Sequence, residues 1–157
     1  MLSAETLDYG LLSEQAKSLI AGEPNLTANL ANISALIFDS MPDLNWAGFY
    51  WVDTPEQLVL GPFQGKVACV RIPIGKGVCG TAAATGITQC ISDVHAFPGH
   101  IACDSASESE LVVPIRCGGK VVGVLDIDSP MLSRFSDTDA RGIEQLVNVL
   151  EQHLEQH

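Results

Sequence analysis

Three of the five cysteines in this chain, Cys69, Cys79 and Cys103, lie in its most glycine-rich and least periodic third. Cys69 and Cys79 bracket the run CVRIPIGKGVC. Cys103 lies in the polar loop HAFPGHIACDSAS, three residues after His100 and directly before Asp104. A buried structural cysteine needs only apolar neighbours, whereas an accessible thiol among ionisable groups can react as a thiolate. These cysteines are therefore the first candidates for chemistry.

Two aspartates on the last predicted strand form a second set of candidates. Side chains alternate across a strand, so Asp126 and Asp128 in the segment VVGVLDIDS project from the same face. Aspartates at strand ends are commonly just exposed to solvent. Two carboxylates that share a face also attract an ammonium ion or raise one another's pKa. The sequence alone leaves both interpretations open.

Glu110 opens the preceding strand, and the register of the hairpin decides whether it joins the aspartates. A two-residue Gly118-Gly119 loop pairs Glu110 with Ile127 and turns it to the other face. A three-residue loop, or a bulge, pairs it with Asp126 on the same face. We expect the second register.

A zinc site is the main alternative use of these cysteines. His100 precedes Cys103 by three residues, but no Cys-x-x-Cys pair is present. Known structural zinc sites rely on such pairs. We therefore expect no metal and no cofactor, and His100 is of interest because it could lower the pKa of Cys103.

Composition limits the class of protein. The chain has 157 residues, 46% of them apolar and 17% charged, which predicts one folded domain over residues 1–157. The formal net charge of −11 argues against nucleic acid and anionic membranes as partners. We find no basic n-region at the N-terminus and no long apolar span, so we expect a cytoplasmic protein. An odd number of cysteines in a cytoplasmic protein argues against a static disulfide framework.

Hydrophobic periodicity predicts the elements that position these residues. Helical spacing covers about 6–21, a second helix capped by Asn25, and a C-terminal helix opened by the capping box at Ser136. A short helix begins at Gly77 and ends at Gly86. Strands are predicted at 46–52, 56–63, 68–72, 88–91, 110–116 and 120–128. This order predicts an α+β fold, a single antiparallel sheet with the N- and C-terminal helices packed on one face.

Four stretches of the chain resemble the free methionine-(R)-sulfoxide reductases, which are built on a GAF domain. They read NWAGFYW, GPFQGKVACVRIPIGKGVCGTAAATG, DVHAFPGHIACDSASESE and GKVVGVLDIDSP, and cover about residues 45–135. The resemblance implies a single GAF-like domain and reduction of free L-methionine (R)-S-oxide to methionine. It also implies thioredoxin as the reductant, and it is compatible with a homodimer.

The resemblance further implies roles for individual residues. Cys103 matches the family's nucleophile, Cys69 the resolving cysteine and Cys79 the third family cysteine. The acidic residues of the substrate site correspond to Glu110, Asp126 and Asp128. The aromatic wall beside the substrate's thioether corresponds to Trp46 and Tyr50. Cys90 and Cys117 lie outside the family pattern.

In the reaction that follows from these roles, the Cys103 thiolate attacks the sulfoxide sulfur while Glu110 protonates its oxygen. Cys103 is left as a sulfenic acid, condenses with Cys69 to a disulfide, and is regenerated by thioredoxin. Two rival hypotheses are a GAF module that senses or binds a small molecule without turning it over, and a metal-binding structural protein.

Overall fold

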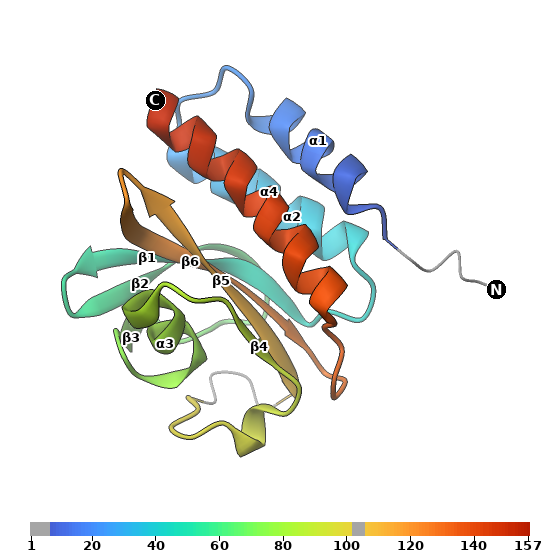
Figure 1. Ribbon diagram of the computed structural model, residues 1–157, viewed down its shortest axis with the longest axis vertical. Coiled ribbons are helices and arrows are strands. Elements are labelled where there is room, and N and C mark those ends of the chain that lie inside the picture. Colours follow the sequence, from blue (N-terminus) through green and yellow to red (C-terminus); the bar gives the residue numbers. More distant parts are fainter. Residues whose placement is uncertain (1–6, 102–105) are drawn as a thin grey trace.

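The computed structural model describes residues 7–101 and 106–157 (Figure 1). Its helices are α1 (Tyr9–Ile20), α2 (Leu26–Ser40), α3 (Gly77–Thr85) and α4 (Asp137–Gln156), with a 3-10 turn at Val94–Ala96. Its strands are β1 (Trp46–Thr54), β2 (Gln57–Gly65), β3 (Arg71–Pro73), β4 (Gln89–Ile91), β5 (Ser109–Cys117) and β6 (Lys120–Ser129). Cys103, the predicted nucleophile, lies outside the described residues.

The strands form one antiparallel sheet in the order β3-β2-β1-β6-β5-β4. The two long hairpins, β1–β2 and β5–β6, meet where β1 pairs with β6 at the centre of the sheet. The predicted α+β architecture, a single antiparallel sheet with terminal helices on one face, is confirmed. None of the helices in the described ranges combines the length and apolar character that a membrane span requires.

Three helices, α1, α2 and α4, cover one face of the sheet (Figure 1). Their starts follow the expected capping chemistry. The Asn25 side chain accepts a hydrogen bond from the Ala28 amide, and Ser136 and Asp139 form a reciprocal capping box. Apolar stripes from these helices meet the strands in the larger of two buried clusters, so this layer supplies most of the hydrophobic stabilisation.

The opposite face of the sheet carries α3 and the connecting loops (Figure 1). Here a smaller buried cluster joins residues of β1, β2, β3, β5, β6 and α3: Trp46, Tyr50, Leu58, Ile72, Val78, Cys79, Ala82, Val112 and Val124. Gly86 caps the C-terminus of α3, and its φ of 69° is the left-handed conformation that favours glycine at this position. The cover over this face is made by one short helix and loops, which leaves room for a pocket.

The third strand is shorter than predicted. Residues 68–70 do not belong to β3, which spans Arg71–Pro73. The segment is held by other contacts: the Leu60 amide donates to the Val70 carbonyl, and the Tyr50 hydroxyl donates to the Cys69 carbonyl at 2.8 Å. The buried Tyr50 side chain therefore holds this segment against the sheet face.

The β5–β6 hairpin corrects the expected register. Its loop is the two-residue Gly118-Gly119 turn, with φ of 62° and 80°, and Cys117 pairs with Lys120. A bulge follows, because Val122 is an extra residue between the pairs Arg116–Val121 and Ile115–Gly123. Glu110 consequently pairs with Asp128, not with Asp126 as predicted. It still lies on the predicted face, because the bulge restores the alternation.

Candidate functional site

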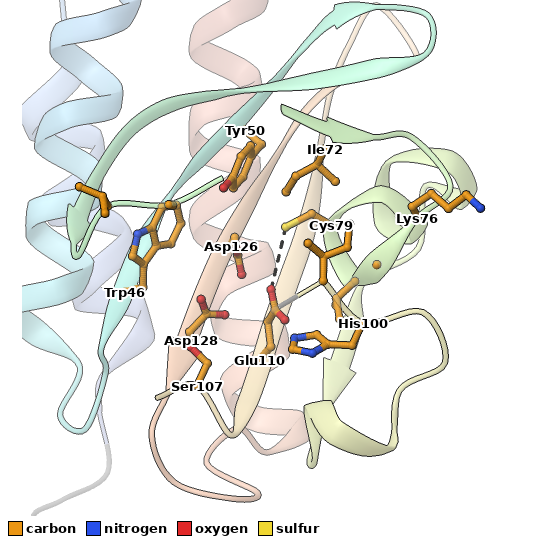
Figure 2. A pocket seen from close by; sticks show the side chains of 15 residues that line it. Trp46, Tyr50, Ile72, Lys76, Cys79, His100, Ser107, Glu110, Asp126 and Asp128 are labelled. Atoms are coloured by element: carbon orange, nitrogen blue, oxygen red, sulfur yellow. Dashed lines mark hydrogen bonds between the residues drawn. The ribbon is translucent and has the colours of Figure 1, made fainter. Parts of the chain in front are cut away.

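A pocket opens on the sheet face that α3 covers (Figure 2). Six of the residues that the resemblance gave a role line it: Trp46, Tyr50, Cys79, Glu110, Asp126 and Asp128. They come from β1, α3, β5 and β6, and are therefore assembled only by the tertiary fold. In Figure 2 the aromatic side chains lie on one side of the carboxylates and Cys79 and His100 on the other.

Strand register places the three carboxylates together. Asp128 pairs with Trp46 on one side and with Glu110 on the other, while Asp126 pairs with Gly48. Residues paired across strands share a face, so all three acids project into the pocket. Glu110 is 7% exposed and Asp126 is 6% exposed, so neither is an ordinary solvent-exposed strand end.

Burial and mutual repulsion dominate the electrostatics of this group. Burial, followed by the charge of Asp126, raises the pKa of Glu110 well above its usual range. The pKa of Asp126 is also raised well above its usual range, first by burial and then by the charge of Asp128. Within the described part of the chain, Asp126 Oδ1 is buried and has no hydrogen-bond partner. Buried carboxylates in this state attract a proton or a cationic group.

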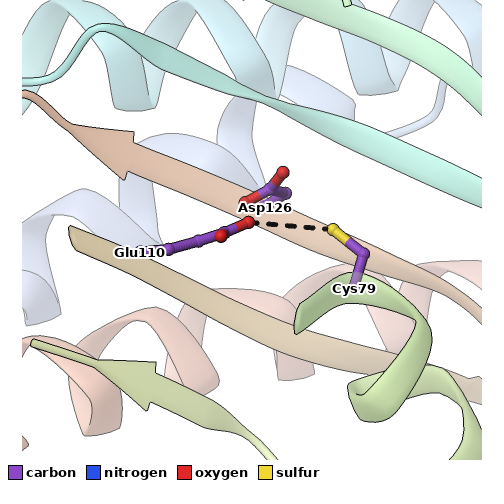
Figure 3. Close-up of side chains that lie close together, drawn as sticks. All are labelled: Cys79, Glu110 and Asp126. Atoms are coloured by element: carbon purple, nitrogen blue, oxygen red, sulfur yellow. Dashed lines mark hydrogen bonds between the residues drawn. The ribbon is translucent and has the colours of Figure 1, made fainter. Parts of the chain in front are cut away.

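Cys79 lies in the first turn of α3 and faces these acids (Figure 3). Its Sγ donates to Glu110 Oε2 at 3.9 Å. A helix N-terminus usually favours a thiolate, but burial, Asp126 and Glu110 together raise the pKa of Cys79 well above its usual value. The thiol is therefore protonated at neutral pH and is a poor nucleophile.

Cys69 lies beside the pocket in the segment held by Tyr50. It is disulfide-bonded, whereas Cys79, Cys90 and Cys117 are free thiols. Cys90 on the edge strand β4 and Cys117 at the β5–β6 turn do not line the pocket. Two of the three cysteines of interest, Cys69 and Cys79, thus differ in redox state in the same structure.

The aromatic wall contains a residue that the sequence analysis missed. Trp46 stacks on Tyr50 at a centroid distance of 5.9 Å and on Phe63 at 5.1 Å, and its Nε1 donates to the Lys66 carbonyl. A Cβ at Gly48 would lie 2.2 Å from Phe63 Cβ, so glycine is required for Phe63 to lie behind Trp46. Local sequence carries no signal for this contact, because it joins side chains of two different strands, β1 and β2.

Three further lining residues refine the polar side of the pocket. Burial, and then the nearby His95, lowers the pKa of His100, so its imidazole is neutral at neutral pH. Lys76 lines the rim, but its ammonium points away from the carboxylates (Figure 2). Ser107, which the sequence analysis missed, accepts a hydrogen bond from Asn45 Nδ2 at 3.1 Å.

The start of α3 forms part of the pocket wall. Gly77 and Val78, the first residues of α3, line the pocket. The first amides of a helix have no partner within the helix and carry partial positive charge. Gly77 has a φ of 65°, a conformation that favours glycine. The pocket is therefore lined by acidic side chains of the sheet and by the first residues of a helix.

Comparison with known proteins gives one consistent result. The model of the GAF domain family matches residues 27–155. Protein YtsP of Bacillus subtilis is 56% identical, with 95% of this chain and 92% of that protein covered. The free methionine-R-sulfoxide reductase of Escherichia coli is 54% identical, with 93% and 88% covered. The structure of fRMsr of Staphylococcus aureus in complex with substrate superimposes with a TM-score of 0.90, at 51% identity over 95% of this chain and 97% of that one.

Proposed function

This chain belongs to the free methionine-(R)-sulfoxide reductases of the GAF domain family, and we propose that it works through Cys103 as nucleophile, Cys69 as resolving cysteine and Glu110 as acid. The protein is an oxidoreductase. The observation that carries the proposal is the meeting of three carboxylates, an aromatic wall and the Cys69 segment in one pocket. This arrangement matches each end of a free methionine sulfoxide molecule.

The amino-acid end of the substrate binds through charge. Its ammonium group lies between Asp126 and Asp128, where it satisfies the buried oxygen of Asp126. Its carboxylate meets the backbone amides at the start of α3. A methionine residue within a peptide lacks both charged groups, so the buried aspartates would be left unpaired. The pocket therefore selects the free amino acid.

The thioether end lies against the aromatic wall. The stacked rings of Trp46, Tyr50 and Phe63 provide an apolar surface for the S-methyl group. Contacts between sulfur and an aromatic ring contribute about 0.3–1.5 kcal/mol. This contact orients the sulfoxide with its oxygen toward Glu110.

In the chemical step the Cys103 thiolate forms a bond to the sulfoxide sulfur, and Glu110 donates its proton to the oxygen. The S–O bond of the substrate breaks, methionine leaves, and the OH group ends on Cys103 as a sulfenic acid. The raised pKa of Glu110 supports its role, because an acid must still hold its proton near neutral pH. The methionine sulfur has thus been reduced by two electrons, and Cys103 has been oxidised by two.

Cys69 then attacks the sulfenic sulfur, and water leaves as the disulfide forms. Two observations support Cys69 over Cys79 as the resolving residue. Cys69 is disulfide-bonded while Cys79 is a free thiol, and the pKa of Cys79 is raised by burial and by the adjacent acids. A dithiol reductant, for which thioredoxin is the candidate, returns both cysteines to thiols by exchange.

The test is a thioredoxin-coupled assay of NADPH consumption with the separate R and S forms of free methionine sulfoxide. We expect consumption with the R form and little with the S form. A peptide containing methionine sulfoxide is the matched control and should not be turned over. Binding of the R form without NADPH consumption would refute the reductase and indicate a sensor instead.

A further inference from the structure

One group of side chains in the pocket has the composition of a metal site. Three residues, Cys79, Glu110 and Asp126, each offer one ligand atom, and these atoms all lie within 4.8 Å of one another. All three residues are buried, and they project from α3, β5 and β6 toward a common point (Figure 3). We call these residues the thiol–carboxylate cluster. Its geometry is set by three separate elements.

A second observation independently points to a cation. Asp126 Oδ1 is buried and has no hydrogen-bond partner among the residues that the structure describes. A buried polar atom left unsatisfied costs about 1–3 kcal/mol, and more when it is charged. The neighbouring Asp128 adds further negative charge at this point. A bound cation would offset this cost.

The thiol distinguishes a metal ion from an ammonium group. An ammonium group satisfies Asp126 but gains nothing from a sulfur ligand, whereas thiolate sulfur selects soft or borderline cations over Mg²⁺ and Ca²⁺. In a tetrahedral zinc site, bonds of about 2.3 Å to sulfur and about 2.1 Å to oxygen place those ligands about 3.6 Å apart. Cys79 Sγ and Glu110 Oε2 are 3.9 Å apart, so only a small shift is needed.

We propose that this protein binds Zn²⁺ through Cys79 Sγ and one carboxylate oxygen each of Glu110 and Asp126, with the fourth position open to the pocket. The S–H proton leaves to solvent when the thiol coordinates. Because the same two acids contact the substrate in the proposed function, Zn²⁺ and free methionine sulfoxide exclude one another. Only this competition rests on the proposed function; the coordination does not.

The experiment uses the full chain prepared without reductant, with Cys69 disulfide-bonded, so that Cys79 is the only free thiol in the pocket among the described residues. Cd²⁺ is titrated as a spectroscopic substitute, and its thiolate charge-transfer absorbance is followed in the ultraviolet. We expect a band at one equivalent that Cys79→Ser abolishes. Cys90→Ser and Cys117→Ser are the matched controls and should retain it.

Calorimetry with Zn²⁺ provides the second readout. Asp126→Asn removes one of the three proposed ligands and should raise the Kd for Zn²⁺ by at least about tenfold. In other metal sites, loss of a residue that only hydrogen-bonds to a metal ligand already weakens binding by about 10–100-fold. This variant decides the question if Cys79→Ser does not fold. A band that persists in Cys79→Ser, or an unchanged Zn²⁺ affinity in Asp126→Asn, overturns the site.

Competition is tested by repeating the Zn²⁺ titration with free methionine sulfoxide present, which should raise the apparent Kd for Zn²⁺. An unchanged Kd overturns the competition. Failure of the reductase proposal is distinguishable, because absence of NADPH consumption leaves the Cd²⁺ band and its dependence on Cys79 unaffected.

Discussion

At the scale of single residues, Glu110 shows how surroundings change the chemistry of a side chain. A free glutamate is ionised at neutral pH. Here burial, and then Asp126, raises its pKa, while Cys79 and Asp128 lie close by. An acid and its neighbouring carboxylates can thus divide two tasks, proton donation and ammonium binding, within one pocket.

Replacement of this acid should have a defined kinetic signature. We expect Glu110→Gln to lower kcat by roughly 10²–10⁴-fold, the usual contribution of a general acid. Because the raised pKa means that activity is present below it and lost as pH rises through it, this variant should also lose the alkaline fall in its pH–rate profile. The control is Glu108→Gln. Glu108 lies two residues away and pairs with the exposed His95, so this variant should keep the kcat and the alkaline fall of the parent protein. An unaltered alkaline limb in Glu110→Gln would assign the acid to another group.

The cysteines make a second prediction at this scale. After one turnover without reductant, mass spectrometry should find a Cys69–Cys103 disulfide, and Cys103→Ser should abolish both the disulfide and the turnover. Cys79 should stay reduced, because its pKa is raised by burial and the adjacent acids. A Cys79–Cys103 bond would reverse the assignment of the resolving cysteine.

At the scale of elements, packing of the helical layer depends on close approach between α1 and α4. A Cβ at Gly142 of α4 would lie 2.1 Å from the ring of Tyr9, whose hydroxyl donates to Asp139 at 2.6 Å. At Gly10 of α1, by contrast, a Cβ would meet only the Asp8 side chain at 3.4 Å. The two glycines are therefore expected to respond in opposite ways to the same substitution.

Thermal or urea unfolding tests this contrast. Gly142→Ala should lower the free energy of unfolding by about 1–3 kcal/mol through overpacking. Gly10→Ala should raise it by up to about 1 kcal/mol, because alanine favours the helix. Both variants should retain activity when folded, since the substituted positions lie in the helical layer away from the pocket. Equal effects of the two substitutions would contradict the close packing of α1 on α4.

At the scale of the whole molecule, the main apolar core and the candidate site lie on opposite faces of one sheet. The helix-covered face holds the larger apolar cluster. The other face buries carboxylates whose pKa values are raised, and this arrangement destabilises the fold at neutral pH. The folded state binds more protons than the unfolded state above the ordinary carboxyl pKa, so stability decreases as pH rises.

Replacing one of these acids with a neutral side chain should therefore make the protein more stable. We expect Asp126→Asn to raise Tm at neutral pH by roughly 4 °C, corresponding to about 1 kcal/mol. The gain should grow as pH rises above the ordinary carboxyl pKa of about 4, because the buried carboxyls of the parent protein hold protons that the unfolded chain has already released. Glu108→Gln should show no such trend, since it is partly exposed. A gain that does not vary with pH would exclude ionisation as its cause.

Much of the molecule follows from local patterns in the sequence. Helical spacing and the caps at Asn25 and Ser136 predicted the terminal helices, because capping and periodicity act within a few residues. Alternation placed Asp126 and Asp128 on one face for the same reason. The quoted motifs also identified the family, and with it the substrate class.

What required the tertiary structure was every relation between distant segments. The bulge at Val122 decided that Glu110 faces Asp128, since the two-residue turn alone would have paired Glu110 with Ile127. The stacking of Phe63 on Trp46, and the approach of Cys79 to the acids, join elements that no local pattern connects. The sequence by itself determined which reactive groups are present and what each element is. Only the fold decided which groups are buried together, and burial is what raises their pKa values.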